Sequence, residues 1–429
     1  PELTKPIPVN KPLHINVIGI IRAPSADIWK IARNFSQPWD LSSSCRLVEG
    51  KDEHQIGAVR QFSVPDDEQV YAERLLEFND DEQSYCYSME RGPNHLIGYQ
   101  SRLQFKTIPG KDWTMVVWDG YCSVPKEQQS SVWSQVETVY RTNIQTLATR
   151  CGWANFEIPD GIEHALLSGE PRLAVSYKGS GELCLFLHGI GNNRFTWQNQ
   201  LAALSSLNMC AASIDYRGYG ASGDYNGPLT EDVLCSDLER VRKHFQVERL
   251  HLVGQSMGSW LALNYYHRFP ERVQTLVLSS GSTGLTLADE ETRKNFRQLR
   301  EKPLINGLQP FENSTNVLPN ITCIHTDETT QAEILQGLCA LRRKTYLSSV
   351  RGYCKPTTSF DLQGISVPVT LIAAQLDKGV PPSDMERVAT EIPNANFTLI
   401  NDAGHIANLD QPEAFNRALI RHFQDSTDN

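Results

Sequence analysis

One short stretch constrains this chain more than any other: residues 250–258 read LHLVGQSMG. The apolar residues at its start predict a strand, and the amphipathic residues 260–269 predict a helix directly after it. Between them, Ser256 is flanked by Gly254 and Gly258. In a G-x-S-x-G arrangement a strand turns sharply into a helix and exposes the serine hydroxyl at the tip. Glycine is needed on both sides because a Cβ there would clash with the crowded backbone.

This pattern often arises by chance, so its meaning depends on the residues downstream. An apolar run at 371–374 leads to Asp377, and residues 401–405 (NDAGH) end in His405. In this order the serine attacks a carbonyl, the histidine takes and returns its proton, and the aspartate orients the imidazole. Asp402 is too close to His405 in sequence to replace Asp377 and would more plausibly steer the histidine loop. The rival acids are Asp215, Asp361, Asp384, Asp402 and Asp410.

The length of 429 residues exceeds one ordinary core and predicts two domains. From residue 173 to 429, apolar runs alternate with helical patterns, which predicts a mostly parallel sheet with helices on both faces. Residues 283–361 interrupt this alternation with helical stretches at 288–300, 330–342 and 344–353. Residues 151–172 have no sustained period, and we interpret them as a linker.

Residues 173–425 resemble the α/β-hydrolase superfamily, most closely its enol-lactonase, meta-cleavage-product hydrolase and simple esterase branch. The resemblance rests on the motifs at Ser256, Asp377 and His405 and on His188-Gly189 after the apolar run 183–187. It implies an oxyanion hole formed by the backbone N–H groups of Ile190 and Met257, and a helical cap at about 283–361. A dinucleotide loop at Gly189 is rejected because Arg194 stands where the third glycine would be.

The cap and the loops near the serine are expected to decide the substrate. We take five residues as candidates for substrate contact, although core packing would explain them equally well. They are Asn192, Phe195, Trp197, Trp260 and Tyr346. Arg217, Arg342 and Arg343 are candidates to meet a substrate carboxylate, for which exposed surface charge is the simpler explanation.

Residues 1–150 have a different pattern. A strand at 14–22 is followed by a helix start at 23–25, several strand-like runs, and a long helical pattern at 127–150. The expected strand-like runs are 45–49, 58–64, 72–78, 84–89, 96–107 and 114–124. These elements predict an α+β domain in which an antiparallel sheet wraps round a long C-terminal helix.

This order resembles the Bet v 1-like superfamily of START-related lipid carriers and polyketide cyclases (SRPBCC proteins), on residues 22–29 (RAPSADIW), residues 57–62 (GAVRQF) and the final helix. The resemblance implies a helix-grip fold with a cavity for a hydrophobic small molecule, and it transfers no catalytic residue. Six polar or aromatic residues are candidates to line that cavity, although solvated strand faces and core aromatics are the simpler explanation. They are Arg60, Tyr71, Glu73, Arg74, Tyr87 and Trp118.

Composition excludes several classes of function. The formal net charge of −10 argues against nucleic acid or an anionic membrane surface as the main partner. The sequence contains no run of about 18 apolar residues, so no transmembrane helix is expected. Residues 1–6 lack the basic and apolar regions of a signal peptide. The ten cysteines contain no C-x-x-C, so neither a metal nor a disulfide framework is expected, and a cytoplasmic location fits best. No cofactor is called for, and the oligomeric state is left open.

The sequence therefore predicts a serine hydrolase that cleaves an ester, lactone, thioester or activated C–C bond of a hydrophobic small molecule. The fusion suggests polyketide-like natural-product or aromatic metabolism, with the N-terminal domain binding or cyclising the substrate. The alternative is a non-hydrolytic cyclase or a ligand-binding protein in which the hydrolase fold does not hydrolyse.

Overall fold

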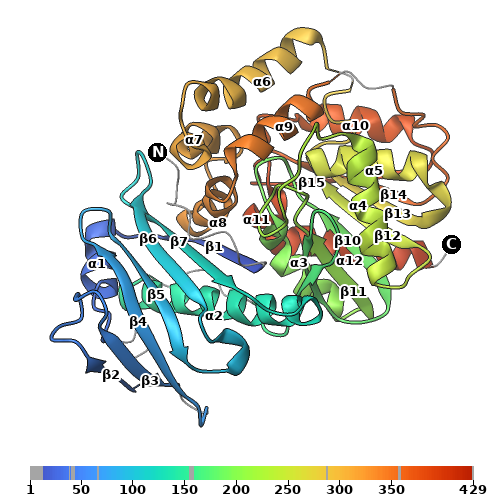
Figure 1. Cartoon of the computed structure of the whole chain (residues 1–429). Helices are drawn as coiled ribbons and strands as arrows, with labels where there is room; N and C mark the ends of the chain where they lie inside the picture. Colours follow the sequence, from blue (N-terminus) through green and yellow to red (C-terminus); the bar gives the residue numbers. More distant parts are fainter. Residues whose placement is uncertain are drawn as a thin grey trace. The chain divides into compact units, whose positions relative to one another are not determined.

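The computed structural model describes residues 13–37, 39, 44–64, 67–153, 159–286, 288–355 and 359–427. The chain divides into two compact units, Pro1–Phe156 and Glu157–Asn429. Each unit has its own sheet, and each is described by itself (Figure 1).

The N-terminal unit is built on a seven-stranded antiparallel sheet with the order β1-β7-β6-β5-β4-β3-β2. The strands are β1 (Leu13–Ile21), β2 (Ser44–Glu49), β3 (Val59–Ser63), β4 (Val70–Asn79), β5 (Ser84–Arg91), β6 (Gln100–Thr107) and β7 (Thr114–Cys122). The helices are α1 (Ser25–Ala32), η1 (Asn94–Leu96), η2 (Lys126–Gln128) and α2 (Gln129–Arg150). The expected antiparallel sheet and long final helix are therefore both present.

Helix α2 packs on the sheet through close contacts at β1 and β7. A Cβ on Gly19 would lie 2.5 Å from Ile144, so only glycine lets the helix approach β1 this closely. Trp118 of β7 stacks on Tyr140 of α2 with ring centroids 4.1 Å apart. The strand expected at 96–107 begins only at Gln100, because Gly98 (φ +74°) turns the chain after η1.

The C-terminal unit contains an eight-stranded sheet with the order β15-β14-β13-β12-β10-β11-β9-β8. Strands β10 to β15 pair in parallel, and β8 and β9 pair antiparallel at one edge. The strands are β8 (Glu163–Leu167), β9 (Leu173–Lys178), β10 (Glu182–Leu187), β11 (Met209–Ile214), β12 (Leu250–Gln255), β13 (Val273–Ser279), β14 (Val369–Ala374) and β15 (Asn396–Ile400). Residues 151–172, interpreted as a linker, thus contain a sheet strand, β8, which lies in the second unit.

Helices cover both faces of this sheet (Figure 1). Helices α3 (Gln198–Ser205) and α12 (Pro412–Thr427) pack over one face, in a buried core that includes Phe186, Trp197 and Phe415. Helix α5 (Met257–Arg268) packs close to strand β10, where a Cβ on Gly258 would lie 2.0 Å from the Leu187 carbonyl oxygen. The helices outside the cap are η3 (Arg194–Trp197), α3 (Gln198–Ser205), α4 (Glu231–His244), α5 (Met257–Arg268), η4 (Pro270–Arg272), α10 (Pro382–Glu391), α11 (Ala407–Asp410) and α12 (Pro412–Thr427).

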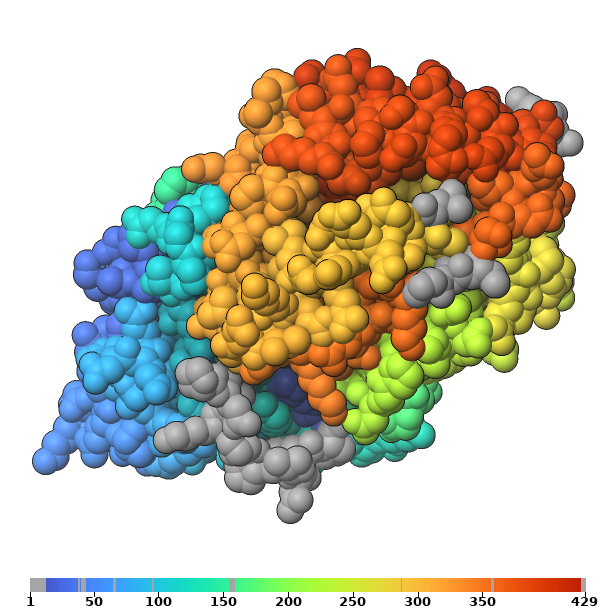
Figure 2. Space-filling model, turned by 90° about the horizontal axis from the view of Figure 1, so that it is seen from above, coloured from blue at the N-terminus to red at the C-terminus, as the bar shows by residue number. Residues whose placement is uncertain are grey.

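The insertion between β13 and β14 is helical, as expected for a cap. It contains α6 (Glu290–Ile305), α7 (Pro310–Val317), η5 (Leu318–Asn320), α8 (Glu328–Cys339) and α9 (Arg343–Tyr353). Helix α7 was not expected; Pro310 at its first turn and a capping box between Gln309 and Glu312 start it. The gold and orange side chains of this segment form a continuous surface in Figure 2.

Candidate active site

Ser256 lies at the turn from β12 into α5. Its φ is +56°, a left-handed conformation that a residue with a side chain adopts only under strain. Its N–H donates to the Ser279 carbonyl of the neighbouring strand at 2.9 Å. A Cβ on Gly254 would lie 2.4 Å from the backbone of Gly258 and Ser259, which explains the glycine before the turn. The predicted strand–serine–helix arrangement is present.

Loops after two other strands border this serine. A Cβ on Gly189, which follows β10, would lie 3.3 Å from Ser256 Cβ. Gly281, which follows β13, has φ +150°, and a Cβ there would lie 2.9 Å from Ser256 Cα. Both loops leave the carboxyl ends of parallel strands, the edge where sites in such sheets form.

Asp377 and His405 are hydrogen-bonded to each other. His405 Nδ1 donates to the two carboxylate oxygens of Asp377 at 2.9 and 3.0 Å. The N–H groups of Gly379 and Val380 donate to the same carboxylate at 2.8 and 3.0 Å. Burial raises the pKa of Asp377, but the charge of His405 and these hydrogen bonds outweigh it, so the pKa is lowered below its usual value.

Gln255, which sequence reasoning missed, joins the serine turn to the histidine loop. Its Nε2 donates to the His405 carbonyl oxygen at 2.9 Å, and its side chain is buried. Its Oε1 would lie 2.4 Å from a Cβ on Gly189. The signal in the sequence was a polar residue at the end of a strand whose residues are all buried.

The rival acids nearest the site have structural partners instead. Asp215 pairs with buried Arg194 and accepts from the N–H groups of Arg194 and Ala221 at 2.7 and 2.8 Å. Asp410 accepts from the Gly404 N–H at 2.7 Å and so holds the residue before His405. Asp377 is thus the acid that the structure brings to His405.

The two expected oxyanion donors lie on the elements that border Ser256. Ile190 follows Gly189 in the loop after β10, and Met257 is the first residue of α5. His188 is buried beneath this loop, where its Nδ1 donates to the Gly189 carbonyl at 2.7 Å. Burial lowers the pKa of His188 to about 4, so its imidazole is neutral and structural.

The five substrate-contact candidates separate in the structure. Asn192 lies in the loop after β10, and its buried Oδ1 makes no hydrogen bond within the described residues. Trp260 and Tyr346 are buried, on α5 and on cap helix α9. Trp197 belongs to the core beneath the sheet, which corrects its assignment to the pocket. Phe195 packs against Arg194 and His164.

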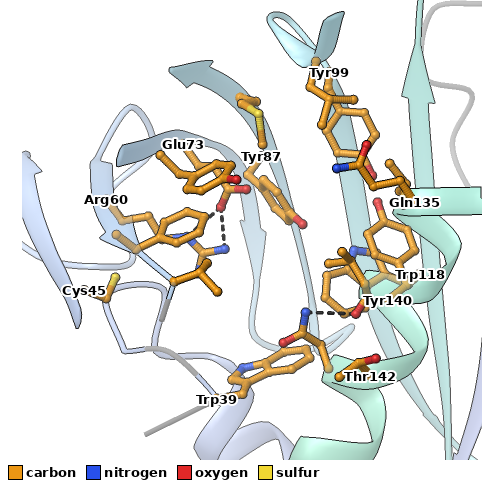
Figure 3. A pocket seen from close by; sticks show the side chains of 18 of the residues that line it. Trp39, Cys45, Arg60, Glu73, Tyr87, Tyr99, Trp118, Gln135, Tyr140 and Thr142 are labelled. Carbon is orange, nitrogen blue, oxygen red and sulfur yellow. Dashed lines mark hydrogen bonds and ion pairs between the residues drawn. The ribbon is translucent and has the colours of Figure 1, made fainter. Parts of the chain in front are cut away.

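The N-terminal unit contains a cavity of about 540 Å³ between its sheet and α2 (Figure 3). Five of the six predicted lining residues do line it: Arg60, Tyr71, Glu73, Tyr87 and Trp118. Arg74 instead forms ion pairs with Glu49 and Glu90.

Polar groups in the cavity are mostly paired. Arg60 and Glu73 form an ion pair at 2.6 Å, drawn at one side of Figure 3. The indole N–H of Trp118 donates to Ser101 at 2.8 Å. The buried Tyr99 hydroxyl makes no hydrogen bond to the described residues. Burial raises the pKa of Tyr85 to about 12, so it presents a neutral hydroxyl.

Within the described ranges, no three histidine, cysteine, aspartate or glutamate side chains are grouped to hold a metal ion. In the same residues, no helix is long and apolar enough to cross a membrane.

The chain is similar to proteins of known class over the C-terminal unit. Residues 183–315 match a family model described as alpha/beta hydrolase fold. A 2-hydroxy-6-oxononadienedioate/2-hydroxy-6-oxononatrienedioate hydrolase of Paraburkholderia phymatum is 28% identical over 271 residues, covering 59% of this chain and 92% of that protein. The 3-oxoadipate enol-lactonase 2 of Acinetobacter baylyi is 27% identical over 257 residues, covering 58% and 92%.

A solved structure has the same fold. A thermophilic esterase from Thermogutta terrifontis superposes with a TM-score of 0.56 at 24% identity, over 62% of this chain and 98% of that one. The C-terminal unit therefore has the α/β-hydrolase fold.

Proposed function

We propose that this chain is a serine hydrolase of small molecules and that its C-terminal unit, which has the α/β-hydrolase fold, belongs to the α/β-hydrolase superfamily. The observation that carries the proposal is the hydrogen-bonded pair of Asp377 and His405, tied through Gln255 to the turn that holds Ser256. The bond cleaved is an ester, a lactone, a thioester or an activated C–C bond of the substrate. The similarity to proteins named as a dienedioate hydrolase and an enol-lactonase supports a hydrolase of this kind.

In this mechanism Ser256 Oγ attacks the substrate carbonyl. His405 Nδ1 is committed to Asp377, so Nε2 is the nitrogen that takes the serine proton and returns it to the leaving group. The Asp377 carboxylate orients the imidazole and stabilises the imidazolium that forms. Its lowered pKa keeps it ionised at neutral pH.

The negative charge that develops on the carbonyl oxygen needs preorganised donors. The N–H groups of Ile190 and Met257 fill this role in our proposal. The position of Met257 at the first turn of α5 supports it, because N–H groups there have no partner inside the helix.

We assign the N-terminal unit the binding or the cyclisation of a hydrophobic substrate or intermediate. The cavity supports this: its aromatic walls favour ring systems, the charges of Arg60 and Glu73 neutralise each other, and the Asp67 carboxylate accepts a hydrogen bond from the Tyr71 hydroxyl. The same cavity supports an alternative function, in which the protein is a non-hydrolytic cyclase or a ligand-binding protein.

A hydrophobic ligand with ring systems fits polyketide-like or aromatic metabolism. The ten free cysteines favour a cytoplasmic location.

Turnover of short 4-nitrophenyl esters tests the hydrolase proposal. Ser256→Ala is expected to lower kcat on the order of 10⁶-fold while leaving the circular dichroism spectrum unchanged. Undiminished turnover in this variant would sink the assignment of the nucleophile.

Binding of the neutral fluorophore N-phenyl-1-naphthylamine tests the cavity. Cys45 lines the cavity and Cys151 does not, although both are partly buried in the same unit. Cys45→Trp is expected to fill the cavity and abolish the fluorescence rise, whereas Cys151→Trp keeps it. Equal binding by both variants would remove the cavity from the proposal.

A further inference from the structure

Asp410 follows His405 at the end of α11, and its two carboxylate oxygens accept hydrogen bonds from two separate segments. One oxygen accepts from the N–H of Gly404, the residue directly before His405, at 2.7 Å. The other accepts from the hydroxyl of Thr326 at 2.8 Å. Thr326 lies in the cap, between η5 and α8, and is 84 positions away in sequence. One carboxylate therefore joins the cap to the loop that carries His405.

The turn that carries Thr326 holds its hydroxyl group in place. Thr326 is 6% exposed, and its hydroxyl oxygen accepts from the Cys323 N–H at 2.9 Å. The Thr326 N–H donates back to the Cys323 carbonyl at 3.3 Å. A Cβ on Gly404 would lie 3.0 Å from the Cys323 nitrogen, so this turn packs directly against the histidine loop. Because the hydroxyl oxygen already accepts from Cys323, its proton is available for Asp410.

The bond from Thr326 to Asp410 is sheltered and involves a carboxylate, which makes it stronger than contacts at the surface. Burial raises the pKa of Asp410, and the hydrogen bonds from Thr326 and Gly404 oppose that rise by favouring the ionised form. Further polar contacts between the cap and the loops of the triad are exposed and contribute little. They include His325 with Asp402, at 3.3 Å, and Lys378 with the Pro319 carbonyl, at 2.9 Å.

We propose that Asp410 and Thr326 are positioning residues for His405, so that the histidine is placed for proton transfer only while the cap packs against its loop. This inference rests on the proposed hydrolase function and adds a structural requirement to it. Gln255, at the end of β12, holds the His405 carbonyl, and Asp410, bound to the cap, holds the Gly404 N–H. Loss of either bond is therefore expected to displace the imidazole.

The same stretch of the cap also packs on the loop expected to bind the oxyanion. Helix α8 directly follows the turn described above. A Cβ on Gly191 would lie 2.9 Å from the Leu338 side chain, and a Cβ on Gly337 would lie 3.1 Å from Asn192 Cα. Gly191 follows Ile190, one of the two proposed oxyanion donors. A shift of this cap segment would therefore disturb the histidine loop and the oxyanion loop together.

Thr326→Val tests the bond, because valine keeps the shape of the side chain and removes the donor. With 4-nitrophenyl acetate as substrate, kcat is expected to fall about tenfold and KM to change little, since a misplaced base slows the chemical step. Thr326→Ser keeps the hydroxyl and is expected to restore most of kcat. A Thr326→Val variant with the kcat of the wild type would overturn the proposal.

Thr345 supplies the matched control. It is a buried threonine of the same cap, on α9, and its hydroxyl donates to the Gly218 carbonyl at 2.9 Å. Gly218 lies in the loop after β11, which carries no member of the proposed triad. Thr345→Val is expected to lower the melting temperature about as much as Thr326→Val does and to leave kcat unchanged. Equal losses of kcat in the two variants would show a general effect of cap stability and contradict the proposal.

A double-mutant cycle tests whether the two residues act through each other. Asp410→Ala removes the bonds to Thr326 and Gly404 at once and is expected to lower kcat further than Thr326→Val does. Adding Thr326→Val to Asp410→Ala should cause no further loss, because the partner is already gone. Losses of kcat that simply multiply would mean that the residues act separately, against the proposal.

Hydrogen–deuterium exchange of residues 401–410 reports on the histidine loop without requiring turnover, and it separates the two proposals. Faster exchange in Thr326→Val than in Thr345→Val, in a protein whose ester turnover survives Ser256→Ala, would support the tie between cap and loop and contradict the hydrolase. Unchanged exchange and unchanged kcat in Thr326→Val, with turnover abolished by Ser256→Ala, would support the hydrolase and contradict the positioning role.

Discussion

At the scale of single residues, the site depends on contacts between segments that are far apart in sequence. Asp377 and His405 are separated by 28 positions, and Gln255 and His405 by 150. Each contact is a single hydrogen bond or pair of hydrogen bonds, and each fixes one orientation. A bond of this kind contributes only about 1 kcal/mol to stability, so its main consequence is positional.

Gln255 offers a test of this positioning. Gln255→Met keeps the volume of the side chain and removes the donor to the His405 carbonyl. We expect kcat for a 4-nitrophenyl ester to fall about tenfold, since small misplacement of a catalytic group slows the reaction, with KM nearly unchanged. Unaltered kcat together with a lower melting temperature would show that the bond serves stability alone.

The sequence predicts a site at Ser256, Asp377 and His405 because each follows a recognisable strand or loop pattern. It does not identify Gln255, because a polar residue at the end of a predicted strand is only a weak local signal. The property that sets Gln255 apart is its hydrogen bond to the His405 carbonyl oxygen, and this exists only in the folded chain. Trp197 is the opposite case. It was a candidate for substrate contact in the sequence, and the structure packs it in the hydrophobic core.

At the scale of elements, glycines set how closely helix and strand approach. Gly258, two residues after Ser256 on α5, lies against the backbone of Leu187 at the end of β10. Gly258→Ala would place a Cβ 2.0 Å from the Leu187 carbonyl oxygen, so α5 must shift.

We expect this variant to lose a few kcal/mol of stability, as for an overpacked core, and to lose activity with it. Thermal melting followed by circular dichroism measures the first effect. A variant with the wild-type melting temperature would mean that α5 moves away without cost, contrary to the packing described here.

Sequence reasoning missed strand β8 and helix α7, because neither shows a sustained hydrophobic period in the sequence. Helix α7 is set by its Pro310 start and capping box, and β8 by pairing with β9. The longer elements of both sheets and α2 were predicted, because their burial patterns repeat over many residues.

At the scale of the whole molecule, the C-terminal unit is expected to be acid-sensitive. His188 has its pKa lowered to about 4 by burial, and the pKa of His422 is lowered to about 3 by burial and by the charge of His251. An unfolded histidine titrates near 6.5, so the unfolded state binds more protons below that pH. The stability of the native state is therefore full above about pH 6.5 and falls as the pH drops toward 4.

For His188 alone this amounts to about 2 kcal/mol at pH 5. Urea unfolding at pH 7 and pH 5 checks it, with His188→Gln as the comparison. The wild type should lose more stability between the two pH values than the variant does. Equal losses would show that protonation of His188 does not contribute.

The central claim concerns the activated serine, and intact-mass labelling with a fluorophosphonate tests it most directly. Such a reagent phosphonylates a serine only where a base and an oxyanion site activate it. We predict one adduct on the wild-type chain, none on Ser256→Ala, and greatly slowed labelling of His405→Ala. An unlabelled wild type, or an adduct that persists in Ser256→Ala, would contradict the account.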